Sequence, residues 1–313
     1  MVLMAKRPRI AVIGSANIDL TTFSDRFPKA GETIFGQKFD LGFGGKGANQ
    51  AAASRLCGAD VFMIARVGSD LFGPATIENF RKLGIDATHV KQIERVSSVV
   101  APIFVEPNGQ NRIFVVKGAN DLLMPADVDA ASDLLKTVDC MVLQFEIPLE
   151  TVYYSVDFAR KNGIRCIVNP APAQPVDLNA LAGLDYFVPN ESEAETITGM
   201  PVRNVEDAKK CAEKLLSGGV KRVILTLGAS GSLLAGRESM EHIPAFSVKS
   251  IDSTGAGDAF IGSFAVFLGE GLSEREAVRR ANLYAGLSTT GVGTQKSFYD
   301  RTRYDSEWAM KSR

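Results

Sequence analysis

A carboxylate stands at the start of a predicted buried helix, within a run of small residues. Residues 252–258 read Asp-Ser-Thr-Gly-Ala-Gly-Asp, and the apolar run Ala259–Leu268 follows at once. The N–H groups of Gly255–Gly257 lie in a first helical turn, where they lack an intrahelical acceptor and the helix dipole favours an anion. A carboxylate beside an anion is unfavourable unless Asp258 takes a proton from a hydroxyl that then attacks a bound phosphate. The simpler interpretation is that Asp258 only caps the helix.

Two polar residues follow soon after the first predicted strand, Ile10–Ile13. Asn17 and Asp19 are two positions apart, so their side chains point to the same side of an extended segment. In an open α/β sheet, ligands bind beyond the carboxyl ends of the strands. Asn17 and Asp19 could therefore hold the hydroxyls of a polyol. An Asx turn that leaves the strand explains them equally well.

A second glycine-rich run covers residues 42–50, Gly-Phe-Gly-Gly-Lys-Gly-Ala-Asn-Gln. It matches the dinucleotide pattern G-x-G-x-x-G formally, but no parallel-type strand directly precedes it. It is not a Walker A motif, because Gly47 stands where Ser or Thr should follow Gly-Lys. The run would let a ligand approach the backbone, with a cation at Lys46 and Asn49 on the first turn of a helix. A glycine-rich surface loop with a solvated lysine is the alternative.

Further polar groups follow other predicted strands. Asn190 and Glu193 open a helix after the strand Tyr186–Val188, where they fit a capping box, or Glu193 could hold a water bound to Mg²⁺. Glu146 also follows an apolar run, although a solvated loop acid is as good an explanation. Thr226–Gly231 is by itself best explained as an ordinary turn. Because the carboxyl ends of parallel strands converge on one crevice, these groups together predict a single site.

The rest of the chain predicts the elements that would position these groups. Short apolar runs, typical of buried parallel strands, occur at Ile10–Ile13, Val61–Ala65, Val138–Leu143, Ile164–Val168, Tyr186–Val188 and Arg222–Leu227. Helical patterns occur at Gly47–Cys57, Thr76–Leu83, Ala126–Lys136, Leu149–Asn162, Ser192–Thr198, Val205–Ser217, Gly257–Leu268 and Ser273–Leu287. This alternating order predicts one α/β domain over residues 1–313, a three-layer α/β/α sandwich with a mainly parallel central sheet.

Two segments interrupt the alternation and lack helical periodicity, Ile18–Phe39 and Ser97–Lys117. In the second, strand-like residues flank the turn Pro107-Asn108-Gly109, which is a hairpin signal. Both segments are predicted to form strands of a small lid outside the main sheet. We place this lid at about residues 16–40 and 96–118.

Composition argues against several classes of protein. The 313 residues are 45% hydrophobic and 23% charged, as in ordinary folded chains. The formal net charge of −1 gives no reason to expect nucleic acid or an anionic membrane as a partner. The four cysteines form no CxxC or CxxH pair, so we expect them to be buried and reduced. The two histidines, His89 and His242, are far apart, which argues against a His-based metal or catalytic site.

Hydropathy along the chain predicts neither export nor membrane insertion. No window approaches the ~20 apolar residues of a membrane span. The first apolar run, Ile10–Ile13, is too short for the core of a signal peptide. We therefore expect a cytoplasmic protein.

Taken together, the motifs resemble the ribokinase family of carbohydrate kinases, also called the PfkB family, over nearly the whole chain. Residues 44–51, Gly-Gly-Lys-Gly-Ala-Asn-Gln-Ala, resemble the first family signature, and residues 252–258 resemble the second and more specific one. Residues 189–193 resemble the family's metal-linked N-x-x-E motif. Asn17-Ile18-Asp19 and Gln144-Phe145-Glu146 resemble its sugar-contacting positions.

The resemblance implies a role for each matching residue. The catalytic base on a primary hydroxyl would be Asp258, and the anion hole for the γ-phosphate would be Gly255, Ala256 and Gly257. Implied sugar contacts are Asn17, Asp19, Gly45, Lys46, Gly47, Ala48, Asn49, Glu146 and Asp258, with apolar contacts from Ala101 and Ile103 of the lid. Implied ATP contacts are Asn190, Thr226, Leu227, Gly228, Ala229, Ser230, Gly231, Gly257 and Asn282. Mg²⁺ would lie near Glu193, through water, and an activating K⁺ would lie near Asp252, Thr254, Ser288, Gly291, Gly293 and Ser297.

The implied activity is ATP-dependent phosphorylation of a sugar, first of all D-ribose to ribose 5-phosphate, by a homodimer joined through the lid. Deoxyribose, a nucleoside or another pentose or hexose are alternative substrates. Two other classes stay open: an NAD-dependent dehydrogenase built on Gly42–Gly47 with Asp60 on the cofactor ribose, and a sugar-sensing protein without catalysis. Ser230 departs from the family, since many relatives carry Arg or Lys there, and the residues after Ser297 do not match it.

Overall fold

The computed structural model describes residues 7–312 of the chain. Within them, nine strands form a central sheet in the order β13-β12-β11-β10-β9-β8-β1-β4-β5. Neighbours from β11 to β5 run parallel, and β12 and β13 are antiparallel additions at one edge. The strands are β1 (Arg9–Ile13), β4 (Asp60–Gly68), β5 (Asp86–Ile93), β8 (Cys140–Gln144), β9 (Arg165–Asn169), β10 (Tyr186–Phe187), β11 (Arg222–Thr226), β12 (Ser232–Gly236) and β13 (Met240–Ile243).

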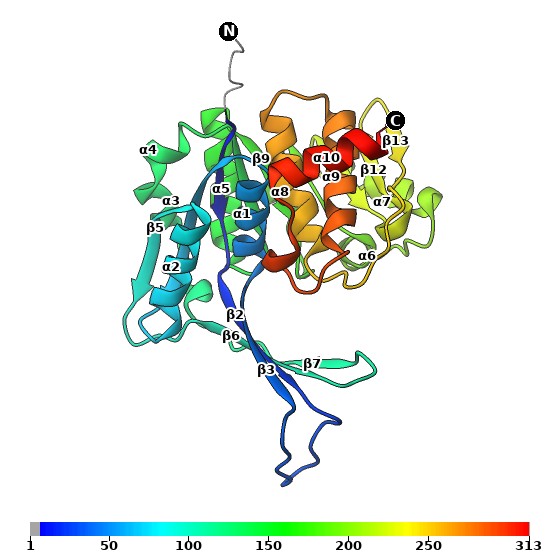
Figure 1. Cartoon of the computed structure of the whole chain (residues 1–313). Helices are drawn as coiled ribbons and strands as arrows, with labels where there is room; N and C mark the ends of the chain where they lie inside the picture. The colour runs from blue at the N-terminus through cyan, green and yellow to red at the C-terminus, as the bar shows by residue number, and fades with distance from the viewer. Residues whose placement is uncertain (1–6, 313) are drawn as a thin grey trace.

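Helices cover both faces of this sheet (Figure 1). On one face pack α1 (Lys46–Leu56), α2 (Phe72–Leu83), α8 (Ala256–Gly269), α9 (Glu274–Ser288) and α10 (Arg301–Lys311). On the other pack α3 (Pro125–Ala130), α4 (Ser132–Leu135), α5 (Leu149–Asn162), α6 (Glu191–Thr198) and α7 (Val205–Ser217). Short 3₁₀ turns are η1 (Ala119–Leu122), η2 (Leu178–Leu181), η3 (Gly228–Ser230) and η4 (Gln295–Ser297). The predicted three-layer α/β/α class is therefore confirmed.

The central strands bury residues on both faces of the sheet. In β1, Ile10 and Val12 belong to the core shared with α1 and α8, whereas Ala11 and Ile13 belong to the core shared with α5. All four are fully buried. This two-sided burial is why the strand is a continuous apolar run rather than an alternation of polar and apolar residues.

A second, four-stranded sheet projects from the body of the molecule (Figure 1). Its order is β3-β2-β6-β7, with β2 (Asn17–Phe23), β3 (Lys38–Gly44), β6 (Val99–Val105) and β7 (Asn111–Ile113). Both predicted lid segments supply its strands, and β6 and β7 form the predicted hairpin. Strand β3 continues past residue 40 and stays paired with β2 as far as Gly44. We call these four strands the small sheet.

The glycine run that ends β3 has the wrong context for a dinucleotide site. Gly42 and Gly44 lie on β3, which is antiparallel to β2 and belongs to the small sheet. The fingerprint instead requires a parallel strand, a tight turn and a helix within one βαβ unit. The interpretation as an NAD-dependent dehydrogenase, with Asp60 on the ribose, is therefore wrong.

Other differences occur where local patterns are weak. The predicted helix at residues 126–136 is broken at Ala131, whose φ of −98° and ψ of 4° separate α3 from α4. The edge strand β5 is rich in polar residues, so it carries no buried-strand pattern. Helix α10 is mostly polar and attaches to the core through the fully buried Tyr304. Among residues 7–312, no helix has the length and hydropathy of a membrane span, and all four cysteines are buried and free.

Candidate active site

The residues singled out in the sequence follow the carboxyl ends of parallel strands. Asn17 comes shortly after β1, Glu146 after β8, Asn190 after β10 and Gly228 after β11. Because these strands belong to one parallel array, their carboxyl ends lie along the same edge of the sheet. The first turn of α8 carries Asp258, and the contacts of this carboxylate with α1 place it at the same edge.

Asp258 is a buried carboxylate held by two amide groups. Its exposed fraction is 6%. Asn49 Nδ2 donates to Oδ2 and Gln50 Nε2 donates to Oδ1, each over 3.0 Å. Burial raises the pKa of Asp258, while the charge of Lys46 and the two amide hydrogen bonds oppose that increase. Both oxygens thus face α1 rather than the N–H groups of their own helix, which argues against a simple capping role.

Close packing of α1 on α8 brings these groups together. A Cβ on Gly262 of α8 would lie 2.6 Å from the carbonyl oxygen of Gln50, so only glycine fits at this crossing. The Ser54 hydroxyl lies 2.8 Å from the Gln50 carbonyl oxygen and 3.1 Å from that of Gly262. Because Asp258 lies one helical turn before Gly262 on α8, this contact places its carboxylate beside Gln50.

Glu146 and Lys46 form a neighbouring charged group. Glu146 Oε2 accepts hydrogen bonds from the Ser15 hydroxyl (2.6 Å) and from the Lys46 backbone N–H (2.9 Å). Burial alone would lower the pKa of the Lys46 side chain, but nearby carboxylates raise it, namely those of Asp258, Glu146 and Glu193. Lys46 is therefore a charged side chain that lies among three carboxylates.

Two glycines at the start of α1, the N-cap Gly45 and Gly47, allow a close approach between backbone segments. Gly45 has a φ of +90°, and a Cβ there would lie 2.8 Å from the backbone nitrogen of Asn17. A Cβ on Gly47 would lie 2.6 Å from the backbone nitrogen of Ser15. The Ala48 N–H donates to the Ser15 carbonyl oxygen over 2.8 Å. The run is thus a packed turn, and the alternative of a solvated surface loop is wrong.

Asn17 and Asp19 both lie on β2 rather than in an Asx turn. They are two residues apart on one strand and therefore share a face of the small sheet. The Asn17 Oδ1 atom accepts a hydrogen bond from Asn120 Nδ2 over 2.8 Å. Burial and the charge of Glu146 raise the pKa of Asp19 to about 6. Hydroxyl groups that donate to Asp19 would favour its charged form.

Glu193 forms the capping box that its spacing predicts. Its backbone N–H donates to Asn190 Oδ1, and its Oε2 accepts from the Asn190 N–H, each over 2.9 Å. Burial raises the pKa of Glu193, with hydrogen bonds from Asn190 and Asn169 acting in the opposite direction. Residues 7–312 contain no cluster of three His, Cys, Asp or Glu side chains able to hold a metal. A single carboxylate fits a water-bound Mg²⁺ better than direct coordination.

The predicted nucleotide residues surround the end of β11. Residues 228–230 form η3, and Gly231 has a φ of +97°, where a Cβ would lie 2.2 Å from the Ile243 carbonyl oxygen. Thr226 pairs with both Asn190 and Ser232. The Asn282 side chain accepts from the Ser232 hydroxyl (2.6 Å) and donates to the Ile243 carbonyl oxygen (3.1 Å). Asn282 thus holds β12 and β13 together, and its contact with a nucleotide stays a prediction.

The predicted cation residues gather beside the start of α8. Asp252 Oδ1 accepts from the Thr254 N–H and Oδ2 accepts from the Gly293 N–H, each over 2.9 Å. These hydrogen bonds lower the pKa of Asp252 although burial opposes them. Gly291 lies against Ser297, and a Cβ on Gly255 would lie 3.0 Å from Thr294 Cγ2. Ser288 closes α9, just before this loop. A carboxylate and a loop rich in backbone carbonyls suit a large hard cation.

Three turn residues precede or open α8 at the proposed anion position. Gly255 is the N-cap with a φ of +79°. The Ala256 N–H donates to the Ser253 carbonyl oxygen over 3.2 Å. A Cβ on Gly257 would meet nothing within 4 Å. The space beside Gly257 therefore lets a ligand approach the backbone, whereas Ala256 already has a protein acceptor.

Several polar residues of this region received no individual role in the sequence analysis, although Gln50 and Gln144 belong to runs that it singled out. Each has a buried or loop-borne polar side chain that contacts a predicted site residue or, for Gln144, contacts Gln50: Ser15, Gln50, Asn120, Gln144, Asn169 and Gln295. Gln144 and Asn169 are the last residues of β8 and β9. A polar residue that ends a buried strand at the carboxyl edge is a signal that could have identified both.

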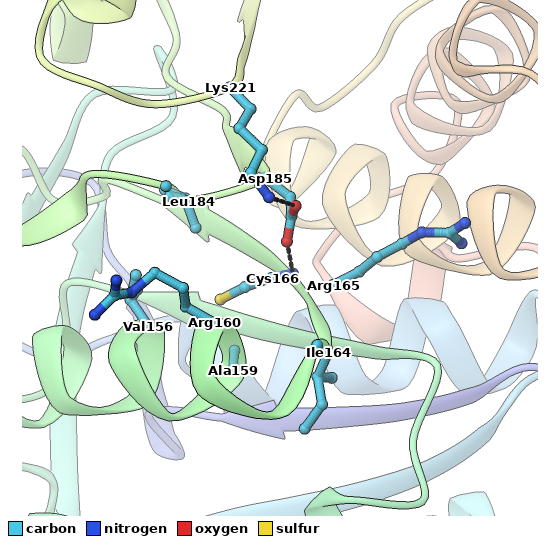
Figure 2. A pocket seen from close by; sticks show the side chains of 11 residues that line it. Val156, Ala159, Arg160, Ile164, Arg165, Cys166, Leu184, Asp185 and Lys221 are labelled. Atoms are coloured by element: carbon cyan, nitrogen blue, oxygen red, sulfur yellow. Dashed lines mark hydrogen bonds and ion pairs between the residues drawn. The ribbon is translucent and has the colours of Figure 1, made fainter.

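A separate hollow of about 130 Å³ lies between α5, the start of β9 and the segment that precedes β10 (Figure 2). It contains none of the predicted site residues. Its central acid, Asp185, accepts from Lys221 Nζ (2.8 Å) and from the Cys166 N–H (2.9 Å). Arg160 is paired with Asp157. Because these charges already have partners within the protein, the hollow offers no comparable chemistry.

Comparisons with known proteins agree on one family. The model of the pfkB family carbohydrate kinases matches residues 7–301. A deoxyribokinase of Salmonella typhi is 44% identical over 290 residues, 92% of this chain and 95% of that protein. A ribokinase of Mus musculus is 38% identical over 294 residues, 92% and 91% of the two chains. The structure of Arabidopsis thaliana ribokinase complexed with ribose and ATP superposes with a TM-score of 0.90 at 30% identity, covering 96% and 98% of the two chains.

Proposed function

This chain belongs to the pfkB family of carbohydrate kinases, and from that premise we propose that it transfers the γ-phosphate of ATP to D-ribose. The products are ribose 5-phosphate and ADP. The observation that carries the proposal is the Asp258 carboxylate, which is held by Asn49 and Gln50 at the start of α8. A general base beside a helix N-terminus suits attack by a hydroxyl on a phosphate.

In the proposed reaction, Asp258 removes the proton of the primary sugar hydroxyl. The hydroxyl oxygen forms a bond to the γ-phosphorus, the bond from phosphorus to the β,γ-bridging oxygen breaks, and ADP leaves with the electron pair. The turn at Gly255–Gly257 would present backbone N–H groups to the transferred group, and the Ala256 N–H would leave the Ser253 carbonyl oxygen to take part. Because phosphoryl transfer needs little covalent chemistry from the protein, positioning and charge stabilisation provide most of the catalysis. Mg²⁺ bound with ATP would neutralise phosphate charge, and Glu193 would hold one of its water ligands.

The polar groups around Asp258 support a hydroxyl-rich substrate. Asn17, Asp19, Lys46, Asn49 and Glu146 together provide carboxylates, amides and a cation within one region. A sugar with every hydroxyl present can pair with more of these groups than a deoxy sugar can. Buried polar groups left without a partner are costly, so the ribose interpretation is preferred.

The second candidate substrate is deoxyribose. It is favoured by the 44% identity to the Salmonella deoxyribokinase, which exceeds the identity to the mouse ribokinase. A panel of ribose, deoxyribose, fructose, adenosine and ketodeoxygluconate, followed by ADP release, separates the two. We expect the highest kcat/KM with ribose. A preference for deoxyribose would support the second candidate, and no ADP release with any sugar would support a sensing protein without catalysis.

We expect K⁺ to raise kcat about tenfold over choline at fixed ionic strength. Asp252 and the loop at Gly291–Gly293 would hold the cation, and Thr294 of the same loop contacts Gly255. Preorganised donors at a reacting oxyanion contribute about 2.7–4 kcal/mol each, so partial misalignment of the turn is measurable. The test follows kcat while K⁺ replaces choline.

A matched pair of variants checks that the response to K⁺ comes from this loop. Asp252→Ala should lose the response. Asp86→Ala should keep it, because Asp86 makes the same kind of hydrogen bond, to the N–H of Thr88 two residues on, but on the edge strand β5. A flat response to K⁺ in the unmodified protein contradicts the cation site and leaves the kinase proposal intact.

We further propose that the small sheet acts as the lid over the sugar. Ala101 and Ile103 of β6 are paired with Asp19 and Thr21 of β2, so both lie beside the proposed sugar contacts. Closure would exclude water and limit wasteful hydrolysis of ATP.

Ribose should therefore slow amide hydrogen exchange in the strands β2, β3, β6 and β7. Helix α7 lies on the face of the central sheet opposite α1 and α8. It serves as an internal reference, because its amide exchange should not change when ribose is added. Equal exchange in the small sheet with and without ribose would reject a moving lid.

Large apolar side chains on the small sheet point to a homodimer. Phe39 of β3, Ile113 of β7 and Phe114, which directly follows β7, are exposed by 60%, 52% and 58%, and a second copy of the chain would cover them. We expect the protein to sediment as a dimer and Ile113→Lys to sediment as a monomer. Met310→Lys changes a comparably exposed residue on α10 and should stay dimeric. A monomeric unmodified protein would contradict this proposal.

A further inference from the structure

The orientation of two amide side chains decides what the Asp258 carboxylate meets. Asn49 presents Nδ2 to Oδ2, and Gln50 presents Nε2 to Oδ1. An amide donates from its nitrogen and accepts at its oxygen, so a turn of 180° would place an oxygen against the carboxylate. Each amide must therefore be held in one of its two orientations.

The Gln50 amide is oriented by two neighbours that end strands of the central sheet. Its Oε1 accepts from Gln144 Nε2 over 2.7 Å, and its Nε2 also donates to Asn169 Oδ1 over 3.3 Å. Asn169 is oriented in turn, because its Nδ2 donates to the Val188 carbonyl oxygen over 3.0 Å. A reversed Gln50 would face Asp258, Gln144 and Asn169 with mismatched atoms. Gln50 and Gln144 are both fully buried.

Gln144 leaves its own oxygen without a partner. Its Oε1 is a buried polar atom with no hydrogen bond among the residues that the structure describes. A Cβ on Gly14 would lie 2.0 Å from this oxygen, so the side chain fits only because residue 14 is glycine. A buried acceptor without a partner is costly, and such exceptions in folded proteins call for an explanation. The hydrogen bond that Gln144 donates to Gln50 explains why this buried oxygen is left without a partner.

The Asn49 amide is oriented from a different segment. Gln295 Nε2 donates to Asn49 Oδ1 over 3.1 Å, which leaves Asn49 Nδ2 for Asp258. Gln295 is itself held, because its Oε1 accepts from Asn79 Nδ2 over 3.3 Å. The two amides at Asp258 are thus oriented independently, one from β8 and one from η4.

The charged groups that face Asp258 act in opposite directions on its ionisation. Lys46 favours the charged carboxylate, Glu146 opposes it, and the charge of Asp258 also acts on Glu193. Burial works against ionisation as well. The two amide N–H groups therefore add to the single cation in favouring the charged form.

We propose that Gln144 and Gln295 are positioning residues that hold the Gln50 and Asn49 amides with their N–H groups toward Asp258, so that Asp258 is kept ionised as a base. This inference rests on the proposed function, in which Asp258 accepts the proton of the sugar hydroxyl. Neither positioning residue contacts Asp258 directly, and each acts through the amide that it orients.

The test compares the acid limb of the kcat/KM pH profile in Gln50→Met, Gln144→Met and the double variant. Loss of the Gln50 N–H should move the limb to higher pH by about one unit, a tenfold change in proton affinity. Gln144→Met should move it in the same direction by less. The double variant should match Gln50→Met, because Gln144 acts through Gln50. Additive shifts, or no shift in Gln50→Met, would overturn the proposal.

A second measurement separates this inference from the proposed function. The ¹³C resonance of the Asp258 carboxyl carbon reports its titration directly, whether or not Asp258 is the base. Its midpoint should rise in Gln50→Met and, through Asn49, in Gln295→Met. An unchanged midpoint in folded variants would overturn the proposal. If Gln50→Met does not fold, Gln144→Met and Gln295→Met test the orienting hydrogen bonds with both amides at Asp258 retained.

A buried hydrogen bond elsewhere controls for a general loss of stability. Thr151 is fully buried on α5, and its hydroxyl donates to the Leu123 carbonyl oxygen over 2.6 Å. Thr151→Val should lower the melting temperature and leave both the acid limb and the carboxyl titration in place. If Thr151→Val shifts the acid limb or the carboxyl titration as much as Gln144→Met does, the effect of Gln144→Met is only structural. That result would overturn the positioning role of Gln144.

Discussion

Asp258→Asn is expected to lower kcat by about 10²–10⁴-fold, the usual contribution of general acid–base catalysis. Asparagine has nearly the same shape as aspartate but cannot take the proton of the sugar hydroxyl. Its amide nitrogen would also face the N–H group of either Asn49 or Gln50, so a small loss of stability should accompany the loss of turnover. Steady-state kinetics and thermal melting measure the two effects.

Sugar binding provides the control for Asp258→Asn. Most of the proposed hydroxyl contacts belong to other side chains, including Asp19 and Glu146, so the ribose Kd measured by calorimetry should change much less than kcat. If the variant keeps more than about a tenth of the normal kcat, the loss is under ~1.4 kcal/mol and Asp258 is not the base.

Gly255→Ala is expected to lower kcat by roughly 10–100-fold. Gly255 has a φ of +79°, and an added Cβ would lie 3.0 Å from Thr294 Cγ2. Relief of this contact and of the backbone strain would turn the peptide groups that precede α8 away from the transferred phosphate. One misdirected donor at such a position costs up to about 2.7–4 kcal/mol. Single-turnover kinetics at saturating ATP and ribose isolate this effect on the chemical step.

Gly271→Ala is the matched control for Gly255→Ala. Gly271 follows α8 with a φ of +85°, and a Cβ there would meet nothing within 4 Å. Both variants should lose about 1–2 kcal/mol of folding free energy through left-handed backbone strain, but Gly271→Ala should keep its activity. Equal loss of kcat in the two variants would show that the effect comes from stability rather than from the phosphate turn.

Local sequence patterns predicted most of the central elements. The predicted bounds of α5 and α7, Leu149–Asn162 and Val205–Ser217, are those found. For α7 the signals are an amphipathic period and Asn204, whose side chain caps the helix. Such signals act within a few residues along the chain, so they can be recognised without knowledge of the rest of the fold.

Elements at the periphery were not predictable in the same way. Helix α10 has few apolar residues, and it is held by Tyr304 and Trp308, which contact aromatic rings elsewhere in the chain. Strand β5 is a polar edge strand, and among the strands of residues 7–312 it pairs with β4 alone. In both cases the stabilising contacts come from distant segments, and no strong local pattern accompanies them.

The same distinction applies to the candidate site. Asn49 and Asp258 belong to short motifs whose residue types already indicated a ligand-binding turn and a base. Their partners come from far along the chain: Gln144 is 94 residues from Gln50, and Gln295 is 246 residues from Asn49. A glutamine in the sequence shows neither which group it meets nor which end of its amide faces that group. These pairings depend on how α1 and α8 pack over the sheet, because amide hydrogen bonds form only when distant backbones bring donor and acceptor within about 3 Å.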